Sequence, residues 1–169
     1  MKSRDIFPKN TMILFVLLLL AMSFLPNEAR SGHTDALLLS CMDYRLVDET
    51  ERYMTSRGLR DKYDHVILAG ASLGVITDKY PSWNQTFWEH LDVAIKLHSI
   101  KKVIVLDHRD CGAFKVILGE DFSKDPLKEK FVHTDKLSAV ESRIKAKYPE
   151  LEIELYLMDL SGNVEKISN

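Results

Sequence analysis

The chain has 169 residues, of which 46% are hydrophobic and 28% are charged, and its formal net charge is −2. This composition excludes an intrinsically disordered or collagen-like chain. The small net charge excludes the basic surface of a nucleic-acid-binding protein. The length corresponds to one ordinary domain.

The N-terminal segment has the features of a secretory signal. Basic residues precede the block Met12–Leu25, which is apolar except for Ser23. This block is shorter than the roughly 20 apolar residues of a membrane span, and a polar stretch follows it. We predict that residues 1–31 are a signal peptide cleaved after Ser31 and that residues 32–169 form a single domain. The mature protein would be periplasmic or secreted, without stable membrane association. An uncleaved N-terminal anchor is the alternative.

The first elements predicted for the mature chain are a strand, a helix and a second strand. Residues 36–40 form a continuous apolar run, which is typical of a strand buried on both faces. Residues 46–57 are predicted to be helical, and Gly58 ends this helix. A second strand is predicted at 65–69, followed by a loop of small residues at 70–74.

A long helix is predicted to begin at Pro81. Ser82 and Gln85 have the spacing of a capping box at its N-terminus. The apolar residues that follow recur at helical spacing and predict a stripe facing the core; they are Trp83, Phe87, Leu91 and Ala94.

The second half of the chain repeats the strand–helix alternation. Residues 102–107 predict the third strand, and a short helix is expected to begin near Gly112. Asp125 and Pro126 provide a cap and a first-turn proline for a further helix. Residues 151–158 alternate in hydrophobicity and predict a fourth strand. This order indicates an α/β fold with three layers, in which a mainly parallel sheet of about four strands, in the order 2-1-3-4, carries helices on both faces.

Two polar clusters follow strands of this predicted sheet. Residues 41–45 (Cys-Met-Asp-Tyr-Arg) follow the first strand, and residues 108–112 (His-Arg-Asp-Cys-Gly) follow the third. In open parallel sheets, ligands bind beyond the carboxyl ends of the strands where the winding direction reverses. If the second and third strands flank the first on opposite sides, both clusters meet at one crevice.

Cys41, His108 and Cys111 would then form one set of metal ligands. Two thiolates and one imidazole suit tetrahedral zinc and leave its fourth position open, which is typical of a catalytic site. The alternative is a Cys41–Cys111 disulfide, since the two cysteines are the only pair in a chain predicted to be exported.

The neighbouring polar residues have simpler interpretations by default. Asp43 and Arg45 can be a helix cap and a surface charge, and Asp107 and Asp110 solvated or capping groups. Arg109 has no assigned partner. The remaining histidines stand singly and are read as ordinary surface or core residues; they are His33, His65, His90, His98 and His133.

Together, Cys41-x-Asp43-x-Arg45 and His108-x-x-Cys111-Gly112 resemble the zinc signature of the β-class carbonic anhydrases. The spacing between the two halves, the α/β order and the ending 156–164 are also similar to that family, and the likeness covers roughly residues 34–169. The resemblance implies one Zn²⁺ per chain, bound by Cys41, His108 and Cys111. It also implies that Asp43 and Arg45 are catalytic residues beside the metal-bound water.

The chain departs from the typical family pattern in two ways. Typical members have an Arg-Asn-Ala-Gly-Asn segment after the second strand, whereas the matching stretch Ile67–Ala71 has lost these polar residues. The chain is also short, without the long N-terminal helical arm that many members use in dimerisation. The resemblance is therefore to a divergent, short branch.

The function implied by the resemblance is the hydration of carbon dioxide to bicarbonate through a zinc-bound hydroxide. The substrate would be a small molecule, with no nucleic-acid partner, and the protein could form a homo-oligomer. Two alternatives keep the zinc: a hydrolase acting on carbonyl sulfide or carbon disulfide, and a non-catalytic protein that binds zinc or a small anion. The disulfide domain without metal is the third alternative.

Overall fold

The computed structural model describes residues 33–168. Its strands are β1 (Ala36–Ser40), β2 (Tyr63–Ile67), β3 (Lys102–His108), β4 (Glu152–Met158) and β5 (Val164–Ile167). Its helices are α2 (Val47–Ser56), α3 (Ser72–Ile76), α4 (Pro81–His98), α5 (Gly112–Leu118) and α6 (Pro126–Lys147), with short 3-10 turns η1 (Tyr44–Leu46) and η2 (Phe122–Lys124). The predicted signal peptide lies outside the described residues.

The strands form a five-stranded sheet in the order β2-β1-β3-β4-β5. Neighbouring strands from β2 to β4 are parallel, which confirms the predicted α/β class and the 2-1-3-4 order. The antiparallel strand β5 was not predicted, because four residues are too few to show a clear periodicity. A turn after β4 returns the chain to the sheet, with the Asp159 carboxylate accepting hydrogen bonds from the backbone N–H groups of Ser161 and Asn163.

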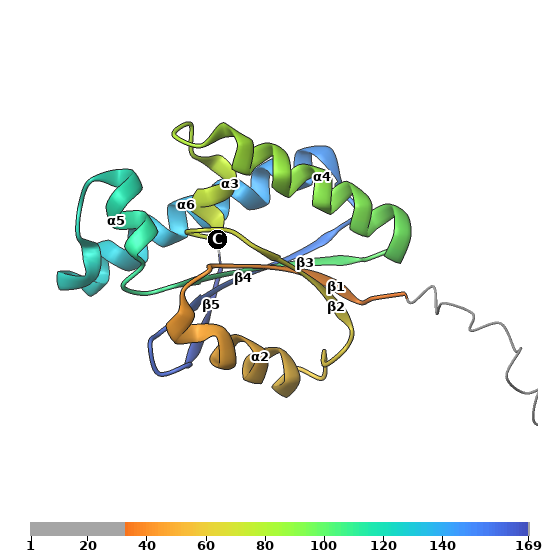
Figure 1. The fold of residues 1–169 in the computed structure, drawn as a ribbon, viewed down its shortest axis with the longest axis horizontal. Coiled ribbons are helices and arrows are strands. Elements are labelled where there is room, and N and C mark those ends of the chain that lie inside the picture. The colour runs from red at the N-terminus through yellow and green to blue at the C-terminus, as the bar shows by residue number, and fades with distance from the viewer. Residues whose placement is uncertain (1–32, 169) are drawn as a thin grey trace, which may run out of the picture. The chain divides into compact units, whose positions relative to one another are not determined.

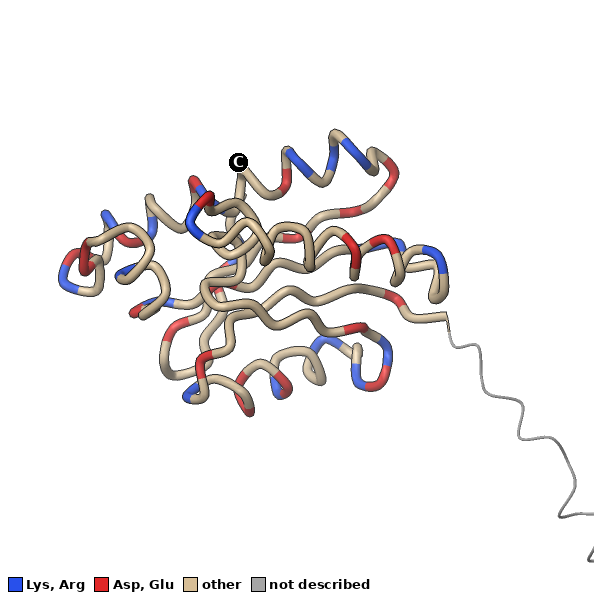
Figure 2. Tube along the Cα trace, turned by 45° about the horizontal axis from the view of Figure 1, so that its top comes forward, with Lys and Arg blue, Asp and Glu red and all other residues tan. Residues whose placement is uncertain are grey.

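Helices cover both faces of the sheet, with α3, α4 and α6 on one face and α2 on the other (Figure 1). Strand β1 is buried along its whole length and divides its side chains between the two faces. Leu37 and Leu39 join the core beneath α4 and α6, whereas Leu38 joins the core beneath α2. Burial on both faces explains the continuous apolar run of this strand. Charged residues lie mainly on the helices and loops outside the sheet (Figure 2).

The caps predicted for two helices are present. Gly58 follows α2 with a φ of 72°, a left-handed conformation that glycine adopts readily. The Asp125 carboxylate accepts hydrogen bonds from two backbone N–H groups in the first turn of α6, and Pro126 occupies that turn. Among residues 33–168, no helix combines the length and the apolar character needed to cross a membrane.

Two local predictions were wrong around β2 and α3. Strand β2 runs over Tyr63–Ile67, because the parallel register places Tyr63 opposite Ala36 and Ile67 opposite Ser40. The following small residues contain the short helix α3 (Ser72–Ile76) in place of a continuous loop. Pairing with β1 decides the bounds of β2, so local composition could not set them.

The start of α4 also differs from the prediction. Tyr80 is the N-terminal flanking residue, and no side chain caps the helix. Ser82 lies inside the first turn, and the Gln85 side chain donates a hydrogen bond to Glu89, so the predicted capping box is absent. Of the predicted core stripe, Phe87, Leu91 and Ala94 are buried, whereas Trp83 is only half-buried and stacks on Tyr80.

Candidate metal centre

The carboxyl ends of β1 and β3 lie side by side because the two strands pair directly and in parallel. Cys41 follows the last residue of β1, and His108 is the last residue of β3. Cys111 lies three residues further on, immediately before α5. The fold therefore brings these three side chains, far apart in sequence, to one edge of the sheet.

The potential ligand atoms of Cys41, His108 and Cys111 all lie within 4.8 Å of one another. The two sulfur atoms are 3.9 Å apart, and both cysteines are free thiols, so the alternative disulfide is not formed. Two sulfurs that each lie about 2.3 Å from a tetrahedral zinc are separated by about 3.8 Å. The observed separation therefore fits a tetrahedral N/S₂ site.

His108 presents one ring nitrogen to this space. Its Nδ1–H donates to the Arg109 backbone carbonyl at 2.8 Å, so in the neutral ring Nε2 carries the lone pair that can bind a metal. Nε2 is buried and has no hydrogen-bond partner among the described residues. A buried polar atom without a partner is costly, and a metal ion at this position would satisfy it. A ligating histidine whose other nitrogen is held in this way is typical of metal sites.

The two thiols ionise unequally. The Cys111 S–H group, His108 and the Gly70 backbone N–H together lower the pKa of Cys41 to about 4 against the opposing effect of burial. The neighbouring Cys41 sulfur and burial raise the pKa of Cys111. The pair therefore favours a single thiolate, and a second thiolate beside it needs a compensating cation.

Asp43 and Arg45 form a bidentate ion pair beside these ligands. Arg45 Nε donates to Asp43 Oδ1 at 2.9 Å, and Nη2 donates to Oδ2 at 2.8 Å. The pair lowers the pKa of Asp43 to about 2. Asp43 also caps the turn η1, as its default interpretation suggested, but its Oδ2 lies 3.8 Å from His108 Nε2. Its carboxylate is thus ionised and faces the ligand set.

Arg45 connects this pair to the loop that follows β3. Nη1 donates to the Asp110 carboxylate at 2.8 Å, and Nη2 donates to the Asp110 carbonyl at 3.0 Å. Asp110 has a φ of 53°, an uncommon left-handed conformation for a residue other than glycine. Arg45 therefore connects the two ligand-bearing segments.

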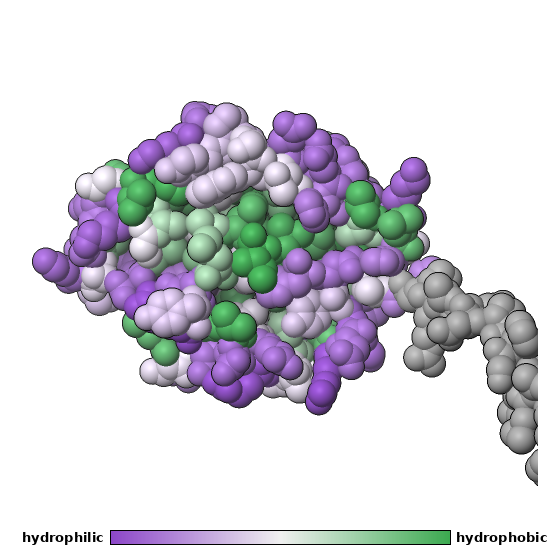
Figure 3. Space-filling model, in the orientation of Figure 1, coloured by the Kyte–Doolittle hydropathy of each residue, from purple (hydrophilic) through white to green (hydrophobic). Residues whose placement is uncertain are grey.

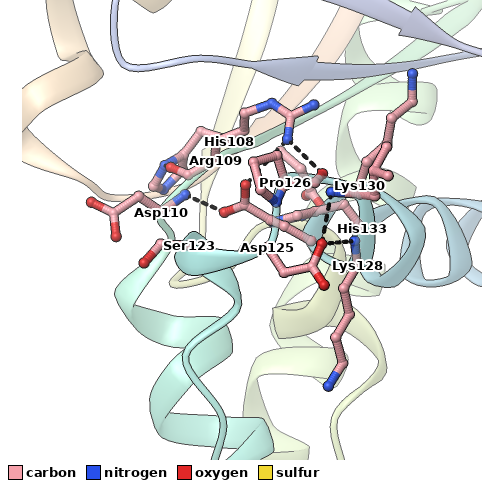
Figure 4. Close-up of polar contacts among 12 residues, drawn as sticks. His108, Arg109, Asp110, Ser123, Asp125, Pro126, Lys128, Lys130 and His133 are labelled. Atoms are coloured by element: carbon pink, nitrogen blue, oxygen red, sulfur yellow. Dashed lines mark hydrogen bonds and ion pairs between the residues drawn. The ribbon is translucent and has the colours of Figure 1, made fainter.

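Glu129 of α6 holds the same loop from the other side. This buried carboxylate accepts the Asp110 backbone N–H at 2.6 Å and also contacts Arg109, whose guanidinium bonds Glu165 as well. Figure 4 shows Arg109 and Asp110 facing the first turn of α6 at Pro126. The strained loop conformation is thus maintained by contacts that sequence spacing could not indicate.

Asp107 was predicted to be solvated or capping; solvation was wrong, whereas its Oδ1 does accept the backbone N–H of Ser72 at the start of α3. Only 1% of it is exposed, and its carboxylate bonds Ser72 of α3 and His133 of α6. Residues two apart on a strand share a face, so Asp107 follows Val103 and Val105 on the face beneath α4 and α6. A carboxylate at the end of such an apolar series is the sequence signal that could have identified it as a buried group.

A cleft of about 450 Å³ opens beside Cys41 and Asp43. Its other lining residues are mainly apolar; they are Met42, Tyr44, Ala69, Tyr80, Trp83, Gly112, Ala113, Val116 and Ile117. Figure 3 shows apolar side chains gathered between α4 and α2 on the face viewed there. A small uncharged molecule could therefore approach the ligand set along an apolar wall.

Comparison with known proteins identifies the family. A family model described as "Putative carbonic anhydrase" matches residues 31–168. An uncharacterized protein of Rickettsia conorii is 43% identical over 141 residues, which cover 83% of this chain and 73% of that protein. An uncharacterized protein of Rickettsia bellii is 42% identical over 141 residues, which cover 83% of both chains.

Solved structures share the fold at low sequence identity. A carbonic anhydrase from Streptococcus mutans is similar with a TM-score of 0.56 and 16% identity, covering 99% of this chain and 100% of that one. Isoform I of the β-carbonic anhydrase of Trichomonas vaginalis is similar with a TM-score of 0.53 and 18% identity, covering 96% and 99% respectively. At this identity the likeness establishes the fold alone.

Proposed function

Since this chain belongs to the "Putative carbonic anhydrase" family, we propose that it binds one zinc ion and hydrates carbon dioxide to bicarbonate. The observation that carries the proposal is the intact Asp43–Arg45 pair beside the convergent side chains of Cys41, His108 and Cys111. A zinc ion with a purely structural role does not need a paired carboxylate facing it.

Cys41, His108 and Cys111 would hold the metal. Their donor set, the sulfur separation and the unpartnered His108 Nε2 all fit this role. When bound, zinc acts as a Lewis acid that lowers the pKa of a water ligand toward neutrality. The Gly70 N–H that donates to the Cys41 sulfur at 3.3 Å stabilises the thiolate form in which this residue would bind the metal.

Asp43 would orient the attacking water. Its carboxylate stays ionised at neutral pH because its pKa is about 2, so it can only accept a hydrogen bond. Arg45 holds both of its oxygens and thereby prevents it from turning freely. A fixed acceptor on one side of the water directs its lone pair toward the substrate on the other side.

The apolar cleft supports a small neutral electrophile as substrate. Carbon dioxide is linear and uncharged, and it would lie against the wall formed by Ala69, Ala113 and Val116. Bicarbonate is charged and finds little polar surface on this wall, which favours its release.

The test is a stopped-flow assay of carbon dioxide hydration on the purified chain, together with metal analysis. We expect about one zinc per chain and hydration above the uncatalysed rate. Zinc binding without hydration would refute the enzymatic proposal and favour a non-catalytic zinc-binding protein. Absence of zinc together with a Cys41–Cys111 disulfide in the purified protein would favour the metal-free domain.

One observation favours a second candidate reaction. The stretch Ile67–Ala71 lacks the polar side chains of typical members, and Ala69 forms part of the apolar cleft wall. A less polar wall favours less polar linear substrates such as carbonyl sulfide or carbon disulfide. Release of hydrogen sulfide from either compound, faster than hydration of carbon dioxide, would favour this reaction.

We also propose that the protein is exported and acts after removal of residues 1–31. The basic start and apolar block of the N-terminal sequence support this. A homo-oligomer stays a prediction, to be tested by measuring the mass of the protein in solution.

A further inference from the structure

A second polar cluster lies inside the protein behind the proposed metal ligands. Its members, Ser72, Asp107 and His133, are at most 1% exposed. Asp107 Oδ1 accepts the Ser72 backbone N–H at 3.0 Å, and Oδ2 accepts the Ser72 hydroxyl at 2.6 Å and His133 Nδ1–H at 2.8 Å. Three donors thus converge on one buried carboxylate, joining β3 to α3 and α6.

The cluster holds a strained turn. Ala71, immediately before Ser72, has a φ of 37°, and Gly70 has a φ of 77°. A left-handed conformation is costly for alanine and persists only when the surroundings enforce it. Both hydrogen bonds from Ser72 to Asp107 act at the residue that follows Ala71, so they enforce the conformation of this turn.

The same turn contacts a proposed metal ligand. The Gly70 backbone N–H donates to the Cys41 sulfur at 3.3 Å. A Cβ atom at Gly70 would lie 3.2 Å from Ala113 Cβ, so the turn is tightly packed against the start of α5. The N–H group therefore has little freedom to move away from the sulfur unless Asp107 releases Ser72.

We propose that Asp107, Ser72 and His133 form a buried anchor that positions the Gly70 N–H on the Cys41 sulfur and so tunes Cys41 as a metal ligand. This inference rests on the proposed role of Cys41. His133 packs on Phe114 with ring centroids 3.9 Å apart, which fixes the ring that donates to Asp107. The three residues are positioning residues, because they act on the ligand through the turn.

The experiment compares Asp107→Asn and Ser72→Ala with a matched control, Glu154→Gln. Glu154 is also a buried strand carboxylate, and it bonds Arg57 and Lys102 on the opposite face of the sheet. Each full-length protein is examined by amide hydrogen exchange at Gly70 and by zinc affinity in competition with a chelator.

We expect both anchor variants to exchange the Gly70 amide at least about tenfold faster and to bind zinc about 10–100-fold more weakly, as for other residues that support metal ligands. The control, Glu154→Gln, should lose stability without any change in Gly70 amide exchange or zinc affinity. Ser72→Ala removes only a hydroxyl and keeps the test valid if Asp107→Asn does not fold.

The inference is overturned if Gly70 exchange and zinc affinity in the anchor variants match those of Glu154→Gln. A wild-type protein that binds no zinc also overturns it. A protein that binds zinc, shows the expected loss in the anchor variants and yet hydrates no carbon dioxide leaves the anchor standing and refutes only the proposed enzymatic function.

Discussion

Removal of the Arg45 guanidinium gives the sharpest test of the proposed catalytic pair. The Arg45 guanidinium makes two hydrogen bonds to the Asp43 carboxylate and two to Asp110. In Arg45→Ala the carboxylate loses both guanidinium donors and keeps only the backbone N–H of residue 45 on Oδ1, and its Oδ2 already lies 3.8 Å from His108 Nε2. We expect Asp43 to turn onto the metal and occupy the position that water needs, so that zinc stays bound while activity falls.

The size of the expected shift from an open to a closed site follows from the pKa of Asp43. Its fall from the ordinary value of 3.8 to about 2 corresponds to about 2.5 kcal/mol at roughly 1.36 kcal/mol per unit. One third of the Arg45 side chain is exposed, and solvent screening reduces this to about 1–2 kcal/mol. Loss of that restraint shifts the balance between an open and a closed site about 5–30-fold. If Asp43 no longer orients the attacking water, the hydration rate can fall further, because a positioned acid–base partner contributes up to about 10²–10⁴-fold in rate.

The assay is carbon dioxide hydration by stopped flow at equal zinc content, with Arg52→Ala as the control. Arg52 is an exposed arginine of α2 that pairs with Glu49 outside the site, so its removal should leave activity unchanged. Asp43→Asn should also keep zinc and lose much of the rate, because an amide can donate to the attacking water and misorient it. Hydration within threefold of wild type in both Arg45→Ala and Asp43→Asn would show that the pair has no catalytic role here.

The remaining predictions concern metal content, loop support, acid stability and processing. Replacing Cys41 or His108 by alanine should remove most of the zinc measured by elemental analysis, because the two remaining ligands bind weakly. Full retention of zinc in these variants would exclude the N/S₂ site. Glu129→Ala should lower the free energy of unfolding by about 2–3 kcal/mol in urea, since the charge-assisted hydrogen bond from the Asp110 N–H to this buried carboxylate is lost. An unchanged value would contradict the role of Glu129 in holding that loop. Burial pushes the pKa of Glu154 upward, but hydrogen bonds from two basic side chains hold it at about 2, below its ordinary 4.5. A lowered carboxyl pKa adds stability that is present above pH 4.5 and is lost as the pH falls toward 2. Glu154→Gln should therefore flatten the loss of stability between pH 4.5 and 2, measured in acid titrations followed by circular dichroism. A curve parallel to wild type would refute the lowered pKa of Glu154. N-terminal sequencing of the mature protein should begin near Gly32, and an intact Met1 in the membrane fraction would indicate an anchor.

Much of the fold could be predicted from the sequence because its signals are local. The apolar run of β1 and the strand–helix alternation indicated a parallel α/β sheet before any contact was known. The proline and aspartate at the start of α6 act on the adjacent backbone, so their effect does not depend on the rest of the molecule. The candidate ligands could be named because they follow strands whose carboxyl ends meet in this architecture.

The tertiary structure alone decided how these ligands are supported. Sequence spacing cannot show that Asp107 is buried against Ser72 and His133, or that Glu129 holds the strained Asp110, because each contact joins elements far apart in the chain. The same holds for the bounds of β2, which pairing with β1 sets. Local chemistry identifies which side chains can bind a metal, whereas packing between strands and helices fixes the distances and the buried partners that decide whether they can do so together.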